Sequence, residues 1–566
     1  MTDNYFPGHR RNLFILGLLG ALFFIPFLGG VHLFDWDEIN FAEISREMLI
    51  TGEYFRIKLN FLPFWEKPPL FFWFQALTMS VFGVNEFSAR LPNALIGMAT
   101  LFILYNIGKN LKNNRFGFIW AGVYFGSILP FLYFKSGIID PLFNLLIFLG
   151  LHFFIKGSWK RRKPEQTTDL KSVWIQMVLA GLFVGLAMLT KGPVAFLIVA
   201  LCLGVYWLFV RLRFFVSPIH FAVFAIFSVL TLGVWFGPET IKNGPWFVEE
   251  FIRYQYRLFS TPDAGHGGFP GYHFVILLVG CFPASIFAIR SFYKKPKEKE
   301  DYFFRDYQLW MKILFWVVLI LFTIVKSKIV HYSSMAYYPL TFLAAMVIDR
   351  ILDRKIVLGR GMKIGLALVA IPFILATFIF PWLGRNLDIL RSRITDPFAL
   401  GNLEAEVNWT GLEVLPGVLL FSVLIAFLVY SKRNNLKRAF ITLFGGTALF
   451  VFVGLIFFVG RIEAYSQRAA IEFFESKIGE DCYVHNFAYK SYAQLFYTRK
   501  QPPENPKSND QQWLLEGDID KDVYFITKVH KEKYVPKRDD IVRIGKKNGF
   551  VFYKREKGQG NEVERE

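Results

Sequence analysis

Long runs of apolar residues recur along most of this chain, and short polar segments separate them. Each run has about 17–22 residues, which is enough for a helix to cross the ~30 Å hydrocarbon core of a bilayer. The runs predict about 13 membrane-spanning helices. They lie near residues 13–33, 86–108, 116–134, 138–155, 173–189, 193–210, 218–236, 272–290, 309–325, 332–349, 363–382, 413–430 and 439–459. The pattern therefore predicts a polytopic α-helical membrane protein.

The basic residues between these runs predict the orientation of the chain. Every second loop carries clustered Lys and Arg, from 109–115 to 432–438, and the positive-inside rule places such loops in the cytoplasm. Because the predicted number of spans is odd, we expect a cytoplasmic N-terminus and a C-terminus outside the membrane. The first run, 13–33, follows a basic start and lacks a small-residue cleavage site, so we expect it to remain as a signal anchor.

Three long segments are expected on the outer side, at 34–85, 237–271 and 383–412. Within the first of them, residues 41–51 have an amphipathic pattern that predicts a short helix lying on the membrane. Glu43 and Glu47 are expected on its solvent-exposed face. The stretch 67–82 starts with two prolines and is too short to span comfortably, so a second juxtamembrane helix is expected there.

Residues 461–566 differ from the rest of the chain. Short helical and strand patterns replace the long apolar runs, and the polar loop 501–512 divides them. This pattern predicts a small extracytoplasmic α/β domain. It would follow a transmembrane domain that covers residues 1–460.

Composition supports a membrane protein and makes a soluble one implausible. The chain is 54% hydrophobic and 19% charged, and it contains 66 Phe. A net charge of +19 would suggest nucleic-acid binding in a soluble protein, but here the basic residues lie between apolar runs. Topology therefore accounts for the charge, and no nucleic-acid partner is expected. The three cysteines suggest neither a disulfide framework nor a metal site.

The polar residues that topology explains least gather at the outer ends of the expected spans. Asp37 and Asp140 also suit the start of a helix, and the lysines also suit side chains that reach up to lipid head groups. However, lysines in short outer turns run against the positive-inside rule, and an anionic ligand at the outer leaflet would account for them. The set comprises Asp37, Glu66, Lys67, Asp140, Lys191, Arg253, Arg257, His266, Lys326, Lys328, His331 and Tyr332.

Acids and bases on one membrane face suit the transfer of a sugar from a lipid-linked phosphate. Nucleotide sugars stay in the cytosol, so a sugar donor on the outer side would be carried on a lipid phosphate. Lys and Arg stabilise the departing polyprenyl phosphate as negative charge develops on it. A carboxylate orients or deprotonates the incoming nucleophile. One inverting step needs no covalent enzyme intermediate.

Five motifs, in this order, resemble those of the polytopic GT-C glycosyltransferases related to aminoarabinose transferase and to protein O-mannosyltransferases. The motifs are DEINFAEISREM, WEKPPLFFW, IIDPL, LTKGPVAFL and KSKIVHY. The best match is to the aminoarabinose transferase branch. The resemblance implies a GT-C fold and an undecaprenyl-phosphate-linked sugar as the donor. It also implies an envelope acceptor such as lipid A, at the outer face of the bacterial inner membrane.

The resemblance also implies roles for individual residues. Asp37 would be the catalytic carboxylate, and Asp140 the second acidic residue of the cavity. The residues expected at the donor phosphate are Lys67, Lys191 and Arg257, with Tyr332 nearby, and the outer lysines Lys326 and Lys328 join them by charge.

Glu66 and His266 match positions where the family can hold a divalent metal ion. One Glu and one His make an incomplete ligand set, so no required cofactor is predicted.

The sequence leaves the acceptor undecided. The family turn KGKLPTY appears here as KSKIVHY, and a lipid A phosphate needs no base whereas a hydroxyl does. A protein O-mannosyltransferase-like enzyme acting on Ser or Thr is one alternative, and a lipid-linked sugar transporter is another. A transporter should carry ionisable residues near the bilayer midplane, whereas these lie at the outer ends of spans, which favours the enzyme.

Overall fold

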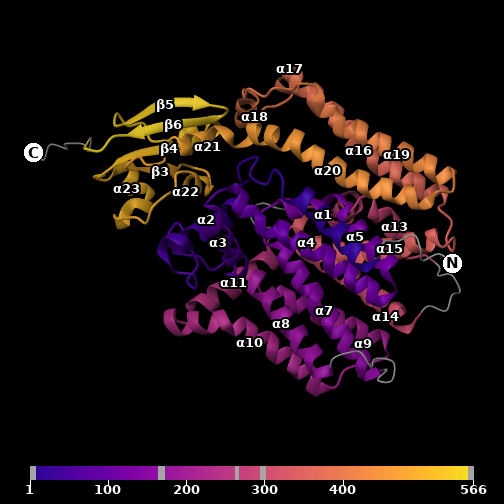
Figure 1. Cartoon of the computed structure of the whole chain (residues 1–566). Coiled ribbons are helices and arrows are strands. Elements are labelled where there is room, and N and C mark those ends of the chain that lie inside the picture. The colour runs from indigo at the N-terminus through magenta and orange to yellow at the C-terminus, as the bar shows by residue number, and fades with distance from the viewer. Residues whose placement is uncertain (1–7, 163–171, 262–266, 294–300, 559–566) are drawn as a thin grey trace, which may run out of the picture.

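The computed structural model describes residues 8–162, 172–261, 267–293 and 301–558. Long helices form a bundle, and a small sheet packs at one end of it (Figure 1). Among the described residues, nine helices are long and apolar enough to cross a membrane, or up to eleven spans if each bent helix pair counts as one. Every predicted apolar run coincides with a helix or with a bent pair.

The long helices confirm most of the predicted spans. They are α4 (Glu86–Leu111), α7 (Asp140–Arg162), α8 (Val173–Lys191), α10 (Pro218–Asn243), α14 (Tyr302–Ile324), the 3₁₀ segment η5 (Val330–Ala336) continued by α15 (Tyr337–Leu352), α16 (Arg360–Arg385), α19 (Leu415–Lys432) and α20 (Leu436–Ser466). The bent pairs are α5 (Asn114–Phe125) with α6 (Ile128–Leu132), and α12 (Tyr272–Gly280) with α13 (Ala284–Arg290).

The difference from the predicted 13 spans lies in helix length. The helices α1 (His9–Phe24) and α9 (Val194–Phe209) have 16 residues each, and the two bent pairs turn by 79° and 113°. Proline contributes to two of these breaks, because Pro26 follows α1 and Pro283 stands between α12 and α13. The apolar runs thus located the helices correctly but did not predict how many residues form one unbroken helix.

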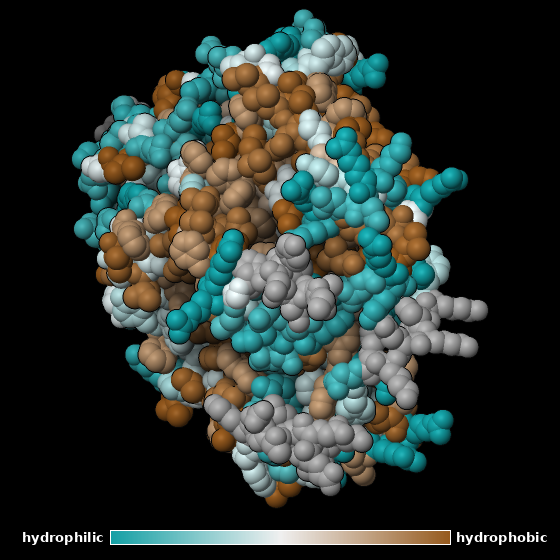
Figure 2. Space-filling model, turned by 45° about the vertical axis from the view of Figure 1, so that its right-hand side comes forward, coloured by the Kyte–Doolittle hydropathy of each residue, from teal (hydrophilic) through white to brown (hydrophobic). Residues whose placement is uncertain are grey.

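Apolar side chains remain exposed along several of these helices. Large apolar residues such as Leu368 and Leu375 on α16, and Ile226 and Leu230 on α10, are at least half exposed. Figure 2 shows apolar residues gathered over much of one face of the molecule. Surfaces of this kind suit contact with lipid, as the composition predicts.

The segment 34–85, predicted to lie on the outer side, contains helices at both predicted places, α2 (Asp37–Thr51) and α3 (Leu70–Phe82). A short hairpin of β1 (Lys58–Leu59) and β2 (Leu62–Pro63) lies between them. The second outer segment contains α11 (Trp246–Ser260), and the third contains α17 (Leu387–Arg391) and α18 (Pro397–Asn402).

The C-terminal domain, from Arg468 onward, is the small α/β structure that the sequence predicts. Its sheet has the strand order β3-β4-β6-β5, in which β3 runs parallel to β4 and the other neighbours are antiparallel. The strands are β3 (Cys482–Asn486), β4 (Asp522–Lys528), β5 (Ile541–Lys547) and β6 (Phe550–Arg555); the helices are α21 (Arg468–Glu475), α22 (Ala493–Tyr497) and α23 (Gln511–Glu516).

The C-terminal domain packs directly on α2. Phe474 and Ile526 of this domain belong to the same buried apolar cluster as Ile39 and Ala42 of α2. The predicted domain boundary at residue 460 falls within the last turns of α20. The two parts of the chain therefore share a core at this contact.

The prediction that α2 exposes Glu43 and Glu47 to solvent is wrong. Their relative exposures are 0% and 1%, because the C-terminal domain covers this face. Arg46 donates to both carboxylate oxygens of Glu43 at 2.7 Å and to the backbone carbonyl of Lys500 at 2.7 Å. Glu47 accepts a hydrogen bond of 2.9 Å from the backbone N–H of Phe61. The C-terminal domain, rather than water, therefore contacts the polar face of α2.

This contact predicts a pH dependence of stability. Burial raises the pKa of the Glu47 carboxyl to about 8, from an ordinary value of 4.5, and the charge of Glu43 acts in the same direction. Between these values the folded chain keeps a proton that the unfolded chain has lost, so stability falls as the pH rises. The fall is at most about 1.4 kcal/mol per pH unit. Thermal unfolding between pH 5 and pH 8 measures it.

A Glu47→Gln variant tests this assignment. The amide does not titrate, so the variant should lose most of this dependence. Burial lowers the pKa of Lys500 only to about 8, so Lys500 does not replace the titration of Glu47 in this range. An undiminished slope in the variant would assign the effect to another group.

Candidate active site

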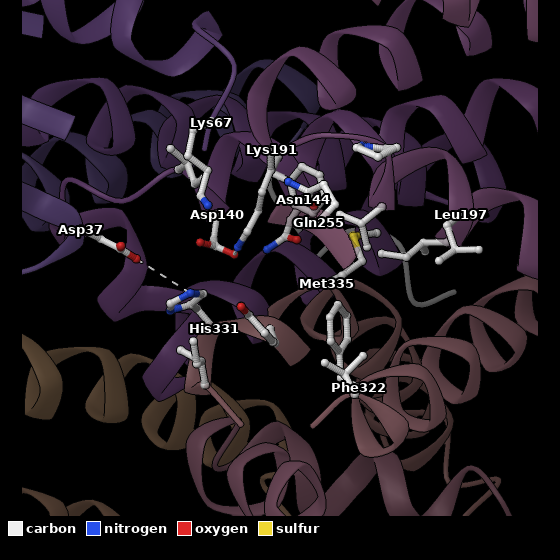
Figure 3. A pocket seen from close by; sticks show the side chains of 18 of the residues that line it. Asp37, Lys67, Asp140, Asn144, Lys191, Leu197, Gln255, Phe322, His331 and Met335 are labelled. Atoms are coloured by element: carbon white, nitrogen blue, oxygen red, sulfur yellow. Dashed lines mark hydrogen bonds and ion pairs between the residues drawn. The ribbon is translucent and has the colours of Figure 1, made fainter. Parts of the chain in front are cut away.

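A cavity of about 310 Å³ lies where α2, α7, α8, α11 and η5 meet (Figure 3). Apolar side chains form the rest of its lining, among them Phe143 of α7, Leu197 of α9 (Val194–Phe209), Phe322 of α14 and Met335 of η5. Its polar lining comes from six separate parts of the chain. The polar lining residues are Asp37, Lys67, Asp140, Asn144, Lys191, Tyr254, Gln255, His331 and Tyr332. Such a mixed lining suits a ligand with a polar head and an apolar tail.

Asp140 and Lys191 form an ion pair in this cavity. Asp140 is the first residue of α7 and Lys191 is the last residue of α8, and Lys191 Nζ lies 2.7 Å from Asp140 Oδ1. The chain turns away at Gly192, whose φ of +106° favours glycine. Lys191 Nζ also lies 5.3 Å from the centre of the Tyr332 ring, at a distance typical of a cation–π contact.

The second carboxylate oxygen of Asp140 lacks a hydrogen-bond partner within the described part of the chain. The Asp140 side chain is 3% exposed, and Oδ2 is buried. Figure 3 shows this oxygen pointing away from Lys191. An unsatisfied buried polar atom costs about 1–3 kcal/mol, so a ligand that donates an O–H or N–H group there would be bound favourably.

Lys67 reaches the cavity from the loop after β2. Its Nζ donates to the hydroxyl of Tyr254 at 3.2 Å and lies 4.7 Å from the centre of that ring. Within the described ranges, no carboxylate lies within ion-pair distance of Lys67. Its positive charge is therefore available to an anionic ligand.

Asp37 and His331 face each other at another part of the lining. Asp37 is the first residue of α2, and its side chain is 40% exposed; that of His331, from η5, is 19% exposed. His331 Nε2 lies 3.9 Å from Asp37 Oδ2 (Figure 3). The residue in the N-cap position of α2 is Trp36. Asp37 is therefore the first helical residue rather than the N-cap, and its carboxylate lines the cavity.

The structure brings together five of the predicted site residues and leaves three outside the lining. Asp37, Lys67, Asp140, Lys191 and Tyr332 all line the cavity, whereas Arg257, Lys326 and Lys328 do not. The Arg257 guanidinium lies 5.1 Å from the ring centre of Tyr254, and Lys326 is exposed.

The predicted phosphate contact of Lys328 disagrees with its geometry. Lys328 Nζ donates to the backbone carbonyls of Phe322, Thr323 and Val325 at 3.0, 2.7 and 2.5 Å. An ammonium group has three N–H donors, so these bonds leave none for a phosphate. Lys328 instead satisfies carbonyl groups at the end of α14.

Sequence reasoning gave no role to four polar residues of the lining. Asn144 lies one turn after Asp140 on the same face of α7, a spacing that offered a signal. Its Nδ2 donates to Ser334 Oγ at 2.7 Å. Tyr254 and Gln255 belong to an outer segment without a distinctive motif. His331 stood in a recognised turn, but its closeness to Asp37 depends on the fold.

The other carboxylates near Asp37 have structural roles. Glu38 accepts hydrogen bonds from Arg90 Nε and Nη2 at 3.0 and 2.8 Å, and from the backbone N–H groups of Phe34 and Gly137 at 3.0 and 2.6 Å. Asp35 is half-buried at the contact with the C-terminal domain, and desolvation raises the pKa of its carboxyl.

The proposed metal ligands do not make a complete set. Glu66 is half-buried beside Lys67, and His266 lies outside the described residues. Within the described ranges, no group of three His, Cys, Asp or Glu side chains is placed to hold a metal ion. A single carboxylate does not fit such a centre, so no step is derived through a metal.

Comparisons with known proteins agree with the motifs. Residues 66–235 match the family model described as dolichyl-phosphate-mannose-protein mannosyltransferase. The chain is 25% identical to an undecaprenyl phosphate-alpha-4-amino-4-deoxy-L-arabinose arabinosyl transferase of Shewanella sediminis, over 62% of each chain. It is 26% identical to the enzyme of the same name from Pectobacterium carotovorum, over 78% of this chain and 74% of that one.

The fold also matches a solved structure over nearly its whole length. The crystal structure of ArnT from Cupriavidus metallidurans bound to undecaprenyl phosphate superposes with a TM-score of 0.76. The superposition covers 96% of this chain and 97% of that one, at 19% sequence identity. The chain spans about three fifths of the length of the Shewanella relative and of two relatives of the same kind from Proteus mirabilis and Photorhabdus laumondii.

These findings confirm the resemblance to aminoarabinose transferases that the motifs predict. The chain is a multi-pass membrane protein with the polytopic GT-C fold and a small C-terminal sheet domain.

Proposed function

We propose that this protein is an inverting glycosyltransferase that moves a sugar from a polyprenyl phosphate to an acceptor in the cell envelope, for which lipid A is the first candidate. One observation carries the proposal: a single cavity holds two carboxylates and two lysines, Asp37, Asp140, Lys67 and Lys191. The relatives are named for an undecaprenyl-phosphate-linked sugar, and the matching crystal structure contains undecaprenyl phosphate. Both support this class of donor.

Lys67 is the proposed partner of the donor phosphate. Asp140 already neutralises Lys191, whereas Lys67 donates to the hydroxyl of Tyr254 and has no carboxylate within ion-pair distance among the described residues. When the bond between sugar and phosphate breaks, the departing phosphate gains a second negative charge. A nearby ammonium stabilises that charge. Arg257, whose guanidinium lies over the ring of Tyr254, adds positive potential beside Lys67. Lys326 is exposed and is proposed to add positive potential from a greater distance.

Asp140 is the proposed sugar-binding carboxylate. The ion pair with Lys191 orients the Asp140 carboxylate, and its unpartnered Oδ2 is ready to accept a hydrogen bond from the donor sugar. Asp37 lies to one side of this pair, next to His331 (Figure 3), and is proposed to orient or deprotonate the acceptor. Tyr332 packs against Lys191 and helps to fix its ammonium.

We place the cavity at the outer face of the bacterial inner membrane, with a cytoplasmic N-terminus and a periplasmic C-terminal domain. The helix α7 starts in the cavity at Asp140 and ends in the basic sequence Lys160, Arg161 and Arg162. Its 23 residues extend for about 34 Å, close to the thickness of a bilayer core. The basic end therefore lies on the opposite side from the cavity, which the positive-inside rule assigns to the cytoplasm.

Transfer to Ser or Thr of a protein is the second candidate function. The match of residues 66–235 to a protein mannosyltransferase model favours it. Mass spectrometry of envelope lipids and glycoproteins from a deletion strain distinguishes the two candidates. The strain should lose one sugar modification, and the wild-type gene should restore it. An unchanged envelope would count against transferase activity.

Replacing Lys67 with Ala should weaken binding of undecaprenyl phosphate by about 10- to 100-fold, because a charge-assisted hydrogen bond is lost. Titration of the purified full-length chain with undecaprenyl phosphate measures the affinity. Lys242→Ala is a matched control, because Lys242 is an exposed lysine in the last turn of α10 that does not line the cavity. Equal affinities for the wild type and Lys67→Ala would remove Lys67 from the donor site.

A further inference from the structure

The pair of Asp37 and His331 has a geometry that suits one particular acceptor group. The two side chains come from α2 and from the turn before α15, and both line the cavity. Asp37 Oδ2 and His331 Nε2 are 3.9 Å apart, which is too far for a hydrogen bond between them. The separation is short enough for one oxygen atom to lie about 2.8 Å from each of them. The pair thus forms a site for a single oxygen atom.

The charges around this site disfavour a phosphate as that acceptor. The described charged residues of the lining are two carboxylates and two lysines, so they sum to zero before His331 is counted. The donor phosphate brings a negative charge that Lys67 balances. A second phosphate would meet the Asp37 carboxylate with no further lysine or arginine in the described lining. Its oxygen would also carry no proton for Asp37 to accept at neutral pH.

A hydroxyl group matches both members of the pair. Its proton is donated to Asp37 Oδ2, and one lone pair accepts a hydrogen bond from the Nε2–H of His331, in the tautomer protonated at that nitrogen. The second lone pair of the oxygen remains for attack on the sugar. We propose that the acceptor of this enzyme is a hydroxyl group held between Asp37 and His331. The inference rests on the proposed function and specifies the chemical class of its acceptor.

The resulting step is balanced in atoms and charge. The bond from the acceptor oxygen to the anomeric carbon forms as the bond from that carbon to the phosphate oxygen breaks. The electron pair of the broken bond leaves with the polyprenyl phosphate, which changes from a monoanion to a dianion. The hydroxyl proton moves to Asp37, which later releases it to water. His331 keeps its own proton and orients the acceptor throughout.

The linkage formed in the envelope tests the acceptor class. Mass spectrometry identifies the component that the deletion strain no longer modifies, and brief mild acid then distinguishes two linkages. A glycoside formed at a hydroxyl survives this treatment, whereas a sugar carried on a phosphate is released, and phosphorus NMR detects the substituted phosphate. An acid-stable glycoside is expected. A sugar on phosphate would overturn the inference and leave the transferase proposal intact.

Variants of His331 test its contribution with that identified acceptor. In the full-length chain in nanodiscs, His331→Phe should raise the half-saturating acceptor concentration about tenfold, because one hydrogen bond is lost. Affinity for undecaprenyl phosphate should stay at the wild-type value. His331→Gln keeps an N–H donor and should recover part of the loss. His220→Phe is the control, because His220 lies in the first turn of α10 and does not line the cavity.

The possible failures point to different conclusions. Unchanged acceptor saturation in His331→Phe would overturn the role of His331. A parallel loss of undecaprenyl phosphate binding and thermal stability would show that His331 only supports the fold, and would overturn the role as well. A wild-type chain that binds undecaprenyl phosphate yet modifies no envelope component would count against the proposed function itself.

Discussion

Replacing Asp37 with Asn is expected to slow sugar transfer by about 10²- to 10⁴-fold, the usual effect of removing a general base. The amide has nearly the shape of the carboxylate but does not accept the acceptor proton. Donor binding should stay unchanged, because the proposed phosphate contact is Lys67. Initial rates of transfer in nanodiscs and titration with undecaprenyl phosphate measure the two effects separately.

A carboxylate from the same outer segment provides the control for this substitution. Glu53 pairs with Lys58 at 2.6 Å and lies outside the cavity lining, so Glu53→Gln should keep wild-type transfer. Near-normal turnover in Asp37→Asn would refute the catalytic assignment. A loss of both donor affinity and thermal stability would indicate that Asp37 supports the local structure.

Replacing Glu38, the neighbouring residue, with Ala is expected to lower the free energy of unfolding by about 3–5 kcal/mol, the range seen when one partner of a buried ion pair is removed. Both Glu38 and Arg90 are buried, and the substitution leaves the guanidinium without its carboxylate. It also removes the acceptor for the N–H groups of Phe34 and Gly137. Thermal unfolding in detergent, followed by intrinsic fluorescence, measures the change.

The double variant Glu38→Ala/Arg90→Met identifies the cause of that loss. Removing the unpaired guanidinium as well should restore part of the stability, and the double-mutant cycle gives the coupling between the two residues. A loss below about 1 kcal/mol in Glu38→Ala, or strictly additive effects, would contradict this account of the pair. These variants therefore test whether adjacent carboxylates of one motif have separable roles, Asp37 in transfer and Glu38 in folding.

Much of the fold could be predicted because the bilayer imposes a simple rule on sequence. Each predicted apolar run contains a helix, since a lipid-exposed segment has to satisfy its own backbone hydrogen bonds. Helix length was less predictable. The bend at α12–α13 has a visible signal in Pro283, whereas the bend at α5–α6 depends on a local break that the apolar run does not reveal.

The site was predictable where motifs placed polar residues at helix ends. Asp140 and Lys191 are 51 positions apart in the chain, yet both lie at helix ends, and they meet in the cavity. Lys328 shows the limit of reasoning from charge, because its ammonium is used by carbonyl groups at the end of α14. Whether a lysine faces a ligand or a helix end depends on backbone geometry.

The α2 helix shows the other limit. Its spacing identified which residues share a face, but not what covers that face. The covering surface comes from a part of the chain that is distant in sequence: the hydrogen bond from Arg46 to the Lys500 carbonyl joins residues 454 positions apart. Local periodicity does not predict a contact between residues so far apart in the chain. The pattern therefore predicted a solvent-exposed face for Glu43 and Glu47, which are buried.

This contact also sets an order for the biosynthesis of the protein. The helix that carries Asp37 is made early, but its cover is made 454 residues later. At synthesis rates of roughly 5–20 residues per second, α2 waits on the order of 20–90 s for its partner. During that interval Glu43, Arg46 and Glu47 lack the protein surface that buries them. The helix that carries Asp37 therefore reaches its final packing only after the residues around Lys500 have been made and have folded.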